Sequence, residues 1–118
     1  MSVRIFQNRD QRFYAHHIHQ FEPIKIKENV NLMETGSLAL EVFILLRGCV
    51  ECKNSGKVFW EGTMFGETDI IFDRKRLETY ISVTDCHVLR IRRPQFETIL
   101  NEVDDFRIDV ESMADQRE

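Results

Sequence analysis

Short apolar runs separated by turn-forming residues fill the middle of the chain, from Ile24 to Ile91. Their β-branched and aromatic residues alternate with polar positions, a pattern typical of half-buried strands. Asn54-Ser55-Gly56 is a turn signal and predicts a hairpin between the runs on either side of it. The predicted strands are Ile24–Ile26, Val30–Leu32, Val42–Leu46, Cys49–Cys52, Val58–Trp60, Thr79–Val83 and His87–Ile91.

Both ends of the chain instead have apolar residues at helical spacing. Residues 5–20 predict a short helix that ends before Pro23, because proline cannot continue a helix. Near the other end, Pro94 suits the first position of a helix, and a second helix is expected after a break at residues 103–105. The positions expected to face inward are Ile5, Phe6, Phe13, Ile18, Phe96, Ile99, Leu100, Phe106, Val110 and Met113.

These patterns predict a single domain that is mostly β with flanking helices. A chain of 118 residues is long enough for one hydrophobic core but not for two. Many short strands separated by turns favour an antiparallel β-roll, a jelly-roll-like double-stranded β-helix. The expected organisation is an N-terminal helical segment (1–22), the β-roll (23–92) and the C-terminal helices (93–118).

Composition and charge exclude several classes of function. Hydrophobic residues make up 42% and charged residues 31%, the balance of a globular protein rather than a disordered one. The net charge is −4 and no segment concentrates Lys and Arg strongly enough for a DNA-binding surface, so we expect no nucleic-acid partner. The apolar run Val42–Leu46 is too short to cross a membrane, and the polar residues 1–20 carry no secretion signal, so direct membrane insertion is not expected.

Cysteines and histidines indicate neither a metal site nor a catalytic centre. Three cysteines, an odd number, favour a reducing compartment over a disulfide scaffold. Cys49 and Cys52 form a C-x-x-C pattern, but residues three apart on a strand point to opposite faces and cannot converge on one ion. His16, His17 and His19 have no matching ligand cluster, and no nucleophile is paired with a base. We therefore expect no metal and no enzymatic activity.

The segment Phe65–Arg76, which reads FGETDIIFDRKR, combines features that suit a phosphorylated ribose. Gly66 allows a tight turn and a close approach of the backbone to a ligand. The next residues, Glu67–Ile71, can form a short helix whose free N–H groups attract an anion. Glu67 can accept hydrogen bonds from a sugar hydroxyl, and the forked guanidinium of Arg76 suits phosphate oxygens.

This segment resembles the phosphate-binding cassette of cyclic-nucleotide-binding domains, with Phe-Gly-Glu, a short helix and Arg at the twelfth position. The likeness covers nearly the whole chain and points to the eukaryotic ion-channel type, the hyperpolarisation-activated and cyclic-nucleotide-gated channels. The matching features outside the cassette are the entry-helix pattern Phe6-x-Asn8-x-Asp10-x-x-Phe13, Gly36, Gly48, Thr84–Cys86, Arg90–Ile91 and Phe96–Leu100.

The resemblance implies a role for each residue of a ligand site. Glu67 would accept the ribose 2′-hydroxyl, and Arg76 would pair with the cyclic phosphate beside the turn at Gly66. From the residues alone, Glu67 could instead be a surface carboxylate that caps its helix, and Arg76 a solvated loop charge. The other implied contacts are Cys52 and Phe59 as the pocket wall for base and ribose, the main-chain amides of Asp69 and Leu77 near the phosphate, and Arg117 near the base.

The resemblance also gives the last helix a second role. Its apolar stripe is typical of a helix packed on the barrel, and in the family this helix is a mobile lid that closes over the ligand. The two roles are compatible. Arg117, which would reach from the lid toward the base, could equally be a frayed terminal charge.

Two acidic residues depart from the family pattern. Asp69 and Glu78 stand where the family has small residues that let amides crowd the phosphate. If both carboxylates point inward, each would repel a phosphate by about 2–4 kcal/mol at an effective dielectric constant of about 20; if they point to solvent, the penalty shrinks greatly. Family members that prefer cGMP often have a threonine at the position of Leu77, whose hydroxyl can bond guanine, so the resemblance implies that this chain favours cAMP over cGMP.

The expected function is therefore a regulatory domain that binds cAMP or cGMP and couples the ligand to the gating of an ion channel or transporter. This implies a cytoplasmic domain of a parent protein in a membrane, with the isolated domain monomeric. The alternative is a degenerate domain of the same fold that has lost nucleotide affinity and serves as an assembly or intramolecular contact module. Asp69 and Glu78 favour that alternative.

Overall fold

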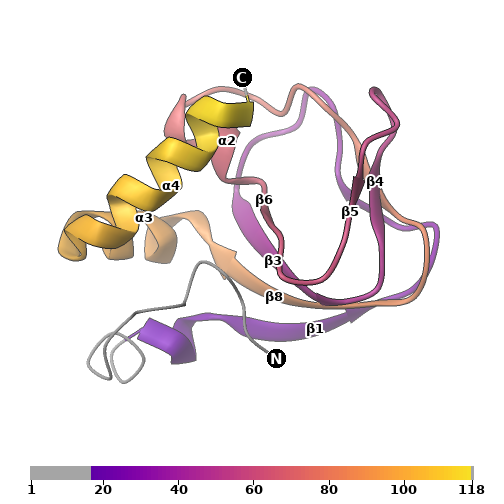
Figure 1. Cartoon of the computed structure of the whole chain (residues 1–118), viewed down its shortest axis with the longest axis horizontal. Coiled ribbons are helices and arrows are strands. Elements are labelled where there is room, and N and C mark those ends of the chain that lie inside the picture. Colours follow the sequence, from indigo (N-terminus) through magenta and orange to yellow (C-terminus); the bar gives the residue numbers. More distant parts are fainter. Residues whose placement is uncertain (1–16, 118) are drawn as a thin grey trace.

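The computed structural model describes residues 17–117 of the chain, and the side chains of residues 17–116 (Figure 1). Two four-stranded antiparallel sheets form the body, with strand orders β1-β8-β3-β6 and β2-β7-β4-β5. The strands are β1 (Glu22–Ile26), β2 (Asn31–Met33), β3 (Glu41–Arg47), β4 (Val50–Cys52), β5 (Val58–Phe59), β6 (Met64–Phe65), β7 (Tyr80–Ser82) and β8 (Cys86–Arg92). The predicted mostly β roll with flanking helices is confirmed.

The central strand β3 buries both of its faces, which explains why it reads as an unbroken apolar run. Successive side chains of a strand point to opposite faces. Val42 and Ile44 pack in the cluster shared with the helices, whereas Phe43 and Leu45 pack in the cluster between the two sheets. The roll therefore has two apolar layers, with β3 between them.

Three helices pack on one side of the roll in the described part of the chain: α2 (Glu67–Ile71), α3 (Arg93–Glu102) and α4 (Asp104–Arg117) (Figure 1). The predicted helix at Pro94 is present, but it begins at Arg93, so Pro94 is its second residue rather than its first. The rings of Phe96 and Phe106 meet edge to face with centroids 6.1 Å apart, which fixes α4 on α3.

The last helix buries a stripe that differs slightly from the predicted one. Phe106, Val110 and Ala114 are fully buried, at spacings of four residues, whereas the expected Met113 is only half-buried. This stripe packs α4 against α2 and α3. The expectation that the last helix packs by an apolar stripe is correct in kind, with Ala114 completing it.

Most of the predicted N-terminal helix, residues 5–20, lies outside the described residues. Its described end is a short 3₁₀ helix, η2 (Ile18–Gln20), and the inward packing expected of Ile18 is wrong because its side chain is 40% exposed. Pro23 follows within β1, an edge strand, which is where a sheet tolerates proline. Within residues 17–117, no helix has the length and apolar character needed to cross a lipid bilayer.

Candidate functional site

The turn at Gly66 joins β6 to α2 and strongly favours glycine. Its φ of +95° lies in the left-handed region, which side chains other than glycine rarely adopt. A Cβ at this position would lie 3.1 Å from the main-chain oxygen of Glu41 and 3.4 Å from an Arg76 guanidinium nitrogen. The Gly66 backbone therefore approaches β3 and Arg76 closely, and its predicted approach to a ligand stays a prediction.

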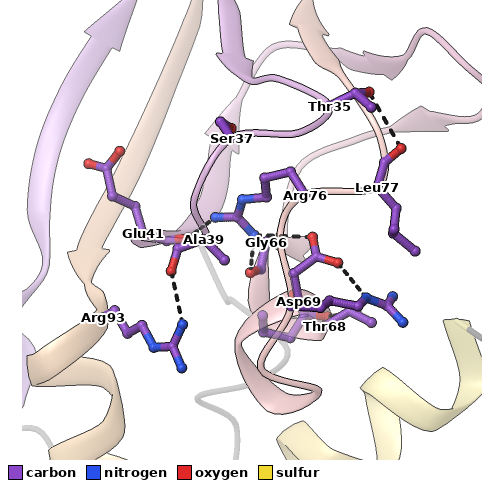
Figure 2. Close-up of polar contacts among 12 residues, drawn as sticks. Thr35, Ser37, Ala39, Glu41, Gly66, Thr68, Asp69, Arg76, Leu77 and Arg93 are labelled. Atoms are coloured by element: carbon purple, nitrogen blue, oxygen red, sulfur yellow. Dashed lines mark hydrogen bonds and ion pairs between the residues drawn. The ribbon is translucent and has the colours of Figure 1, made fainter.

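The loop after α2 returns Arg76 to this turn. Its main chain is fixed on both sides, since the Arg76 amide donates to the oxygen of Ser37 at 2.9 Å and its carbonyl accepts from Gly36 at 2.8 Å. The guanidinium donates from Nη1 to the Gly66 oxygen at 2.6 Å and from Nη2 to the Glu41 oxygen at 2.5 Å (Figure 2). Arg76 is only 3% exposed, so its interpretation as a solvated loop charge is wrong.

The burial of Arg76 makes its charge dependent on neighbouring carboxylates. Loss of hydration lowers the pKa of Arg76, and the negative charges of Asp69, Glu67 and Glu41 oppose that shift. A buried cation is tolerated when it is paired and hydrogen-bonded. The site is thus a buried guanidinium held by two main-chain oxygens and surrounded by acidic residues.

Asp69 points toward the arginines of the cassette rather than toward solvent. Its Oδ1 accepts from Arg74 Nε at 2.9 Å, and its Oδ2 lies 3.4 Å from Arg76 Nη1 (Figure 2). The Asp69 side chain is 13% exposed. Of the two orientations that the sequence left open for Asp69, the inward one is present.

Glu67 is the first residue of α2 and is completely buried. The interpretation of Glu67 as a surface carboxylate is therefore wrong. Its Oε1 accepts a long hydrogen bond, 3.4 Å, from the hydroxyl of Thr68. A carboxylate in the first turn of a helix is favoured by the backbone dipoles there. Glu67 and Arg76 thus lie at the same turn, as the cassette pattern predicts.

The residues expected to form the pocket wall lie on the second sheet. The Cys52 thiol, 1% exposed, donates to Oε2 of Glu78 at 2.9 Å, so the second acidic residue also points inward. Phe59 is buried and stacks on Phe65 and Tyr80, with ring centroids 6.2 and 5.3 Å away. Sequence reasoning missed this aromatic stack, which joins Phe59 of β5 and Tyr80 of β7, two strands that both pair with β4.

The last two predicted site residues differ in how far the structure describes them. The Leu77 side chain is 56% exposed and points away from the Arg76 guanidinium (Figure 2). Its main-chain oxygen faces the Thr35 hydroxyl at 3.4 Å. Arg117 is the last residue of α4, and its side chain lies outside the described residues.

Arg93, a residue without any motif signal, connects the cassette to α3. Its Nη2 pairs with Asp73 at 2.8 Å, its Nε with Glu97 at 2.5 Å, and its Nη1 donates to the Ala39 oxygen at 3.4 Å. Hydrogen bonds to the two carboxylates raise the pKa of Arg93. The cassette loop and the start of α3 are therefore joined by one side chain.

The cysteines are three separate buried thiols in different surroundings. Cys86 Sγ lies 3.4 Å from the main-chain oxygen of Cys49, whereas Cys52 contacts Glu78. Burial, with smaller contributions from Cys86 and Glu51, raises the pKa of the Cys49 thiol. Over residues 17–117, no group of three or more His, Cys, Asp or Glu side chains is placed to hold a metal ion.

Comparison with known proteins gives one family. The family model of the cyclic nucleotide-binding domain matches residues 23–103. No curated protein matches the chain.

Similar solved structures share the fold. A proposed cyclic nucleotide-binding protein of Geobacter metallireducens has a TM-score of 0.82 at 15% identity, covering 97% of this chain and 88% of its own. The regulatory subunit of a cAMP-independent protein kinase A from Trypanosoma brucei has a TM-score of 0.83 at 16% identity, and the match covers 98% of this chain and 42% of that subunit. The regulatory domain of Toxoplasma gondii protein kinase A, crystallised with cAMP, has a TM-score of 0.71 at 24% identity, and the match covers 80% of this chain and 39% of that chain. This chain thus spans less than half of the two kinase regulatory chains.

Proposed function

Because the chain belongs to the cyclic nucleotide-binding domain family, we propose that it is a regulatory domain that binds a cyclic nucleotide and passes a conformational change to the protein of which it is a part. The observation that carries this proposal is the buried Arg76 guanidinium beside the turn at Gly66. A ligand that binds one conformation of the domain better shifts the population toward it. A coupling free energy of about 1–3 kcal/mol is enough for useful control.

In this proposal the cassette holds the phosphate and the ribose. Arg76 pairs with the cyclic phosphate, and the buried Glu67 accepts the 2′-hydroxyl of the ribose. Gly66 keeps the backbone close, and the amides of Asp69 and Leu77 approach the phosphate. These roles require donors and acceptors at one turn, and the proximity of Arg76 to Gly66 supports them.

The second sheet and the last helix would hold the rest of the nucleotide. Cys52 and Phe59 lie on paired strands of that sheet and are proposed to form the wall for base and ribose. The stacked ring of Phe59 offers an apolar face of the kind that nucleobases prefer. Arg117, at the end of α4, is proposed to reach the base when the helix closes.

Among nucleotides we expect cAMP to bind better than cGMP. Leu77 cannot offer a hydroxyl to guanine, and one similar structure, the Toxoplasma gondii regulatory domain, contains cAMP. Leu77→Thr should therefore improve cGMP binding relative to cAMP by about fivefold, the equivalent of one added hydrogen bond. An unchanged ratio of the two dissociation constants would remove this basis for the preference.

The partner in this proposal is an ion channel or transporter in a membrane, with this chain as its cytoplasmic domain. The sequence pattern Phe6-x-Asn8-x-Asp10-x-x-Phe13 supports a channel, although it lies outside the described residues. The proposal is tested on the full-length parent by recording currents, or transport, before and after adding cyclic nucleotide on the cytoplasmic side. A response identical with and without nucleotide would exclude gating by this domain.

A second candidate function is a contact module without nucleotide affinity. Its support is that two acidic side chains point inward: Asp69 toward Arg76, and Glu78 toward Cys52. Such a domain would keep the fold and the helix contacts while its own carboxylates occupy the site. The two candidates differ in one measurable property, the affinity of the isolated domain for cyclic nucleotides.

Titration of the isolated domain separates the two candidates. Calorimetry with cAMP and cGMP, and with 5′-AMP as a ligand control that lacks the cyclic phosphate, should show saturable binding of a cyclic nucleotide. Ligand at about a hundred times its dissociation constant adds about 2.7 kcal/mol of stability, which gives a clear upward shift of Tm. No heat and no Tm shift with either cyclic nucleotide at millimolar concentration would favour the contact module.

A further inference from the structure

We propose that Asp69 sets the affinity of this site by pairing with the Arg76 guanidinium that would bind a ligand phosphate, so that binding exchanges the Asp69–Arg76 contact for a phosphate–Arg76 contact. This inference rests on the proposed function of the domain. Asp69 stands at a position of the cassette where the family has a small residue. Asp69 would act as an internal competitor whose charge lowers the affinity without removing it.

The geometry of Asp69 favours an exchange over a permanent block. Its contact with Arg74 is 2.9 Å long, within the range of a strong charge-assisted hydrogen bond, whereas its contact with Arg76 is 3.4 Å long. The weaker of the two contacts is therefore the one that involves Arg76. If a phosphate approaches Arg76, Asp69 can remain paired with Arg74 and so keeps a counter-charge.

The competition follows from the burial of Arg76. The Arg76 side chain is 2% exposed, and its charge needs a nearby anion. Asp69 supplies one when no ligand is bound. A cyclic phosphate supplies the same charge, so the two anions compete for one guanidinium and repel each other in a site that water screens poorly.

Two other acidic side chains near the cassette have different partners. The carboxylate of Glu41 pairs with Arg90 at 3.1 Å, so it is the main-chain oxygen of Glu41 that meets Arg76. The carboxylate of Glu78 contacts the Cys52 thiol on β4. The contact of Asp69 with both arginines makes it the side chain whose removal should change phosphate binding most directly.

The test compares three substitutions in the isolated domain, each titrated with cAMP by calorimetry. Asp69→Asn keeps the shape but removes the competing charge, and it should tighten binding by about tenfold or more. Arg74→Gln removes the other partner of Asp69, so that Asp69 pairs with Arg76 alone. The stronger Asp69–Arg76 pair and the loss of one nearby positive charge should together weaken cAMP binding by about tenfold. Asp73→Asn is the matched control, because it removes one charge from the same loop at an 85% exposed side chain paired with Arg93. Its dissociation constant should stay within about twofold of the parent.

The outcomes separate this inference from the proposed function. Tighter binding by Asp69→Asn supports the inference, even if the parent domain itself binds too weakly to detect, in which case the proposed function of the parent fails. Equal binding by the parent and Asp69→Asn overturns the inference and leaves the function intact. No binding by either overturns both. If Asp69→Asn does not fold, Asp69→Ala, which restores a small residue at this position, is titrated in its place: tighter binding than the parent supports the inference, and an equal dissociation constant overturns it.

Discussion

The guanidinium of Arg76 donates a 2.6 Å hydrogen bond to the main-chain oxygen of Gly66, ten residues earlier in the chain. A second bond, to the oxygen of Glu41, ties the same side chain to β3. Arg76 is therefore a structural link between the cassette and the sheet as well as the proposed phosphate ligand. Removing it should affect the fold, contrary to what a solvated loop position implies.

Arg76→Lys should weaken both the fold and nucleotide binding. Lysine keeps the charge but cannot donate in a fork, so at least one of the two buried oxygens loses its partner. We expect the free energy of unfolding to fall by about 1–3 kcal/mol, and cAMP affinity to fall by about tenfold or more. Urea unfolding and calorimetry measure the two effects. A lysine variant as stable as the parent would show that the carbonyl contacts contribute little.

Gly66→Ala should destabilise the domain more than the same change at Gly56. Both glycines have positive φ, +95° at Gly66 and +74° at Gly56. An alanine at either position is strained in this left-handed conformation by about 1 kcal/mol or more. At Gly56 the new methyl group meets open space, whereas at Gly66 it lies 3.1 Å from the Glu41 oxygen. The difference in unfolding free energy between the variants isolates this close approach. An equal loss of unfolding free energy in the two variants would mean that the backbone around Gly66 moves to accommodate the methyl group.

Phe106→Ala should loosen the packing of α4. The ring is fully buried against Phe96, and removing such a side chain costs about 3–5 kcal/mol. Ile108→Ala on the same helix is the matched control, because that side chain is 57% exposed and its loss should change stability by about 0.5 kcal/mol or less. Thermal unfolding followed by circular dichroism compares the two. Similar Tm values for both variants would contradict the observed burial.

Cys49 should make the domain less stable at alkaline pH. Burial raises the pKa of the folded Cys49 thiol above its ordinary value of 9.0. As pH rises, the thiol of the unfolded chain therefore loses its proton before the thiol of the folded protein does. The contribution of the protonated Cys49 to the free energy of unfolding is fully present below about pH 9 and is lost as pH rises through the folded pKa. Cys49→Ala should show a shallower decline, by at most about 1.4 kcal/mol per pH unit. Identical slopes of unfolding free energy against pH for both proteins would contradict this.

The sequence was sufficient to locate the cassette because its parts are local. Gly66, Glu67 and Arg76 lie within twelve positions, so a short stretch of sequence is enough to show the resemblance to the cassette. The strands of the roll were predicted for a similar reason, since alternation is a local property. The exception is β6, where the two residues Met64 and Phe65 are too few to show any period.

Orientation within the site could not be predicted in this way. Whether Asp69 faces solvent or Arg76 depends on how the returning loop positions Arg74 and Arg76, and that loop is held by residues 36 and 37 from another part of the chain. The role of Arg93 has the same origin, because its partners Ala39, Asp73 and Glu97 come from three separate segments. Such contacts depend on tertiary structure, which local patterns do not contain.

The two sheets of the roll are unequal in strand length. β3 and β8 are seven residues each and pair along most of their length, whereas every strand of the other sheet has two or three residues. Backbone amides of the short-stranded sheet should therefore exchange with deuterium through low-energy local openings, while those of β3 should exchange only when the whole molecule unfolds. The proposed wall residues Cys52 and Phe59 belong to the sheet that we expect to open more readily, so a small molecule would enter by brief separation of that wall without disturbing the longer strands.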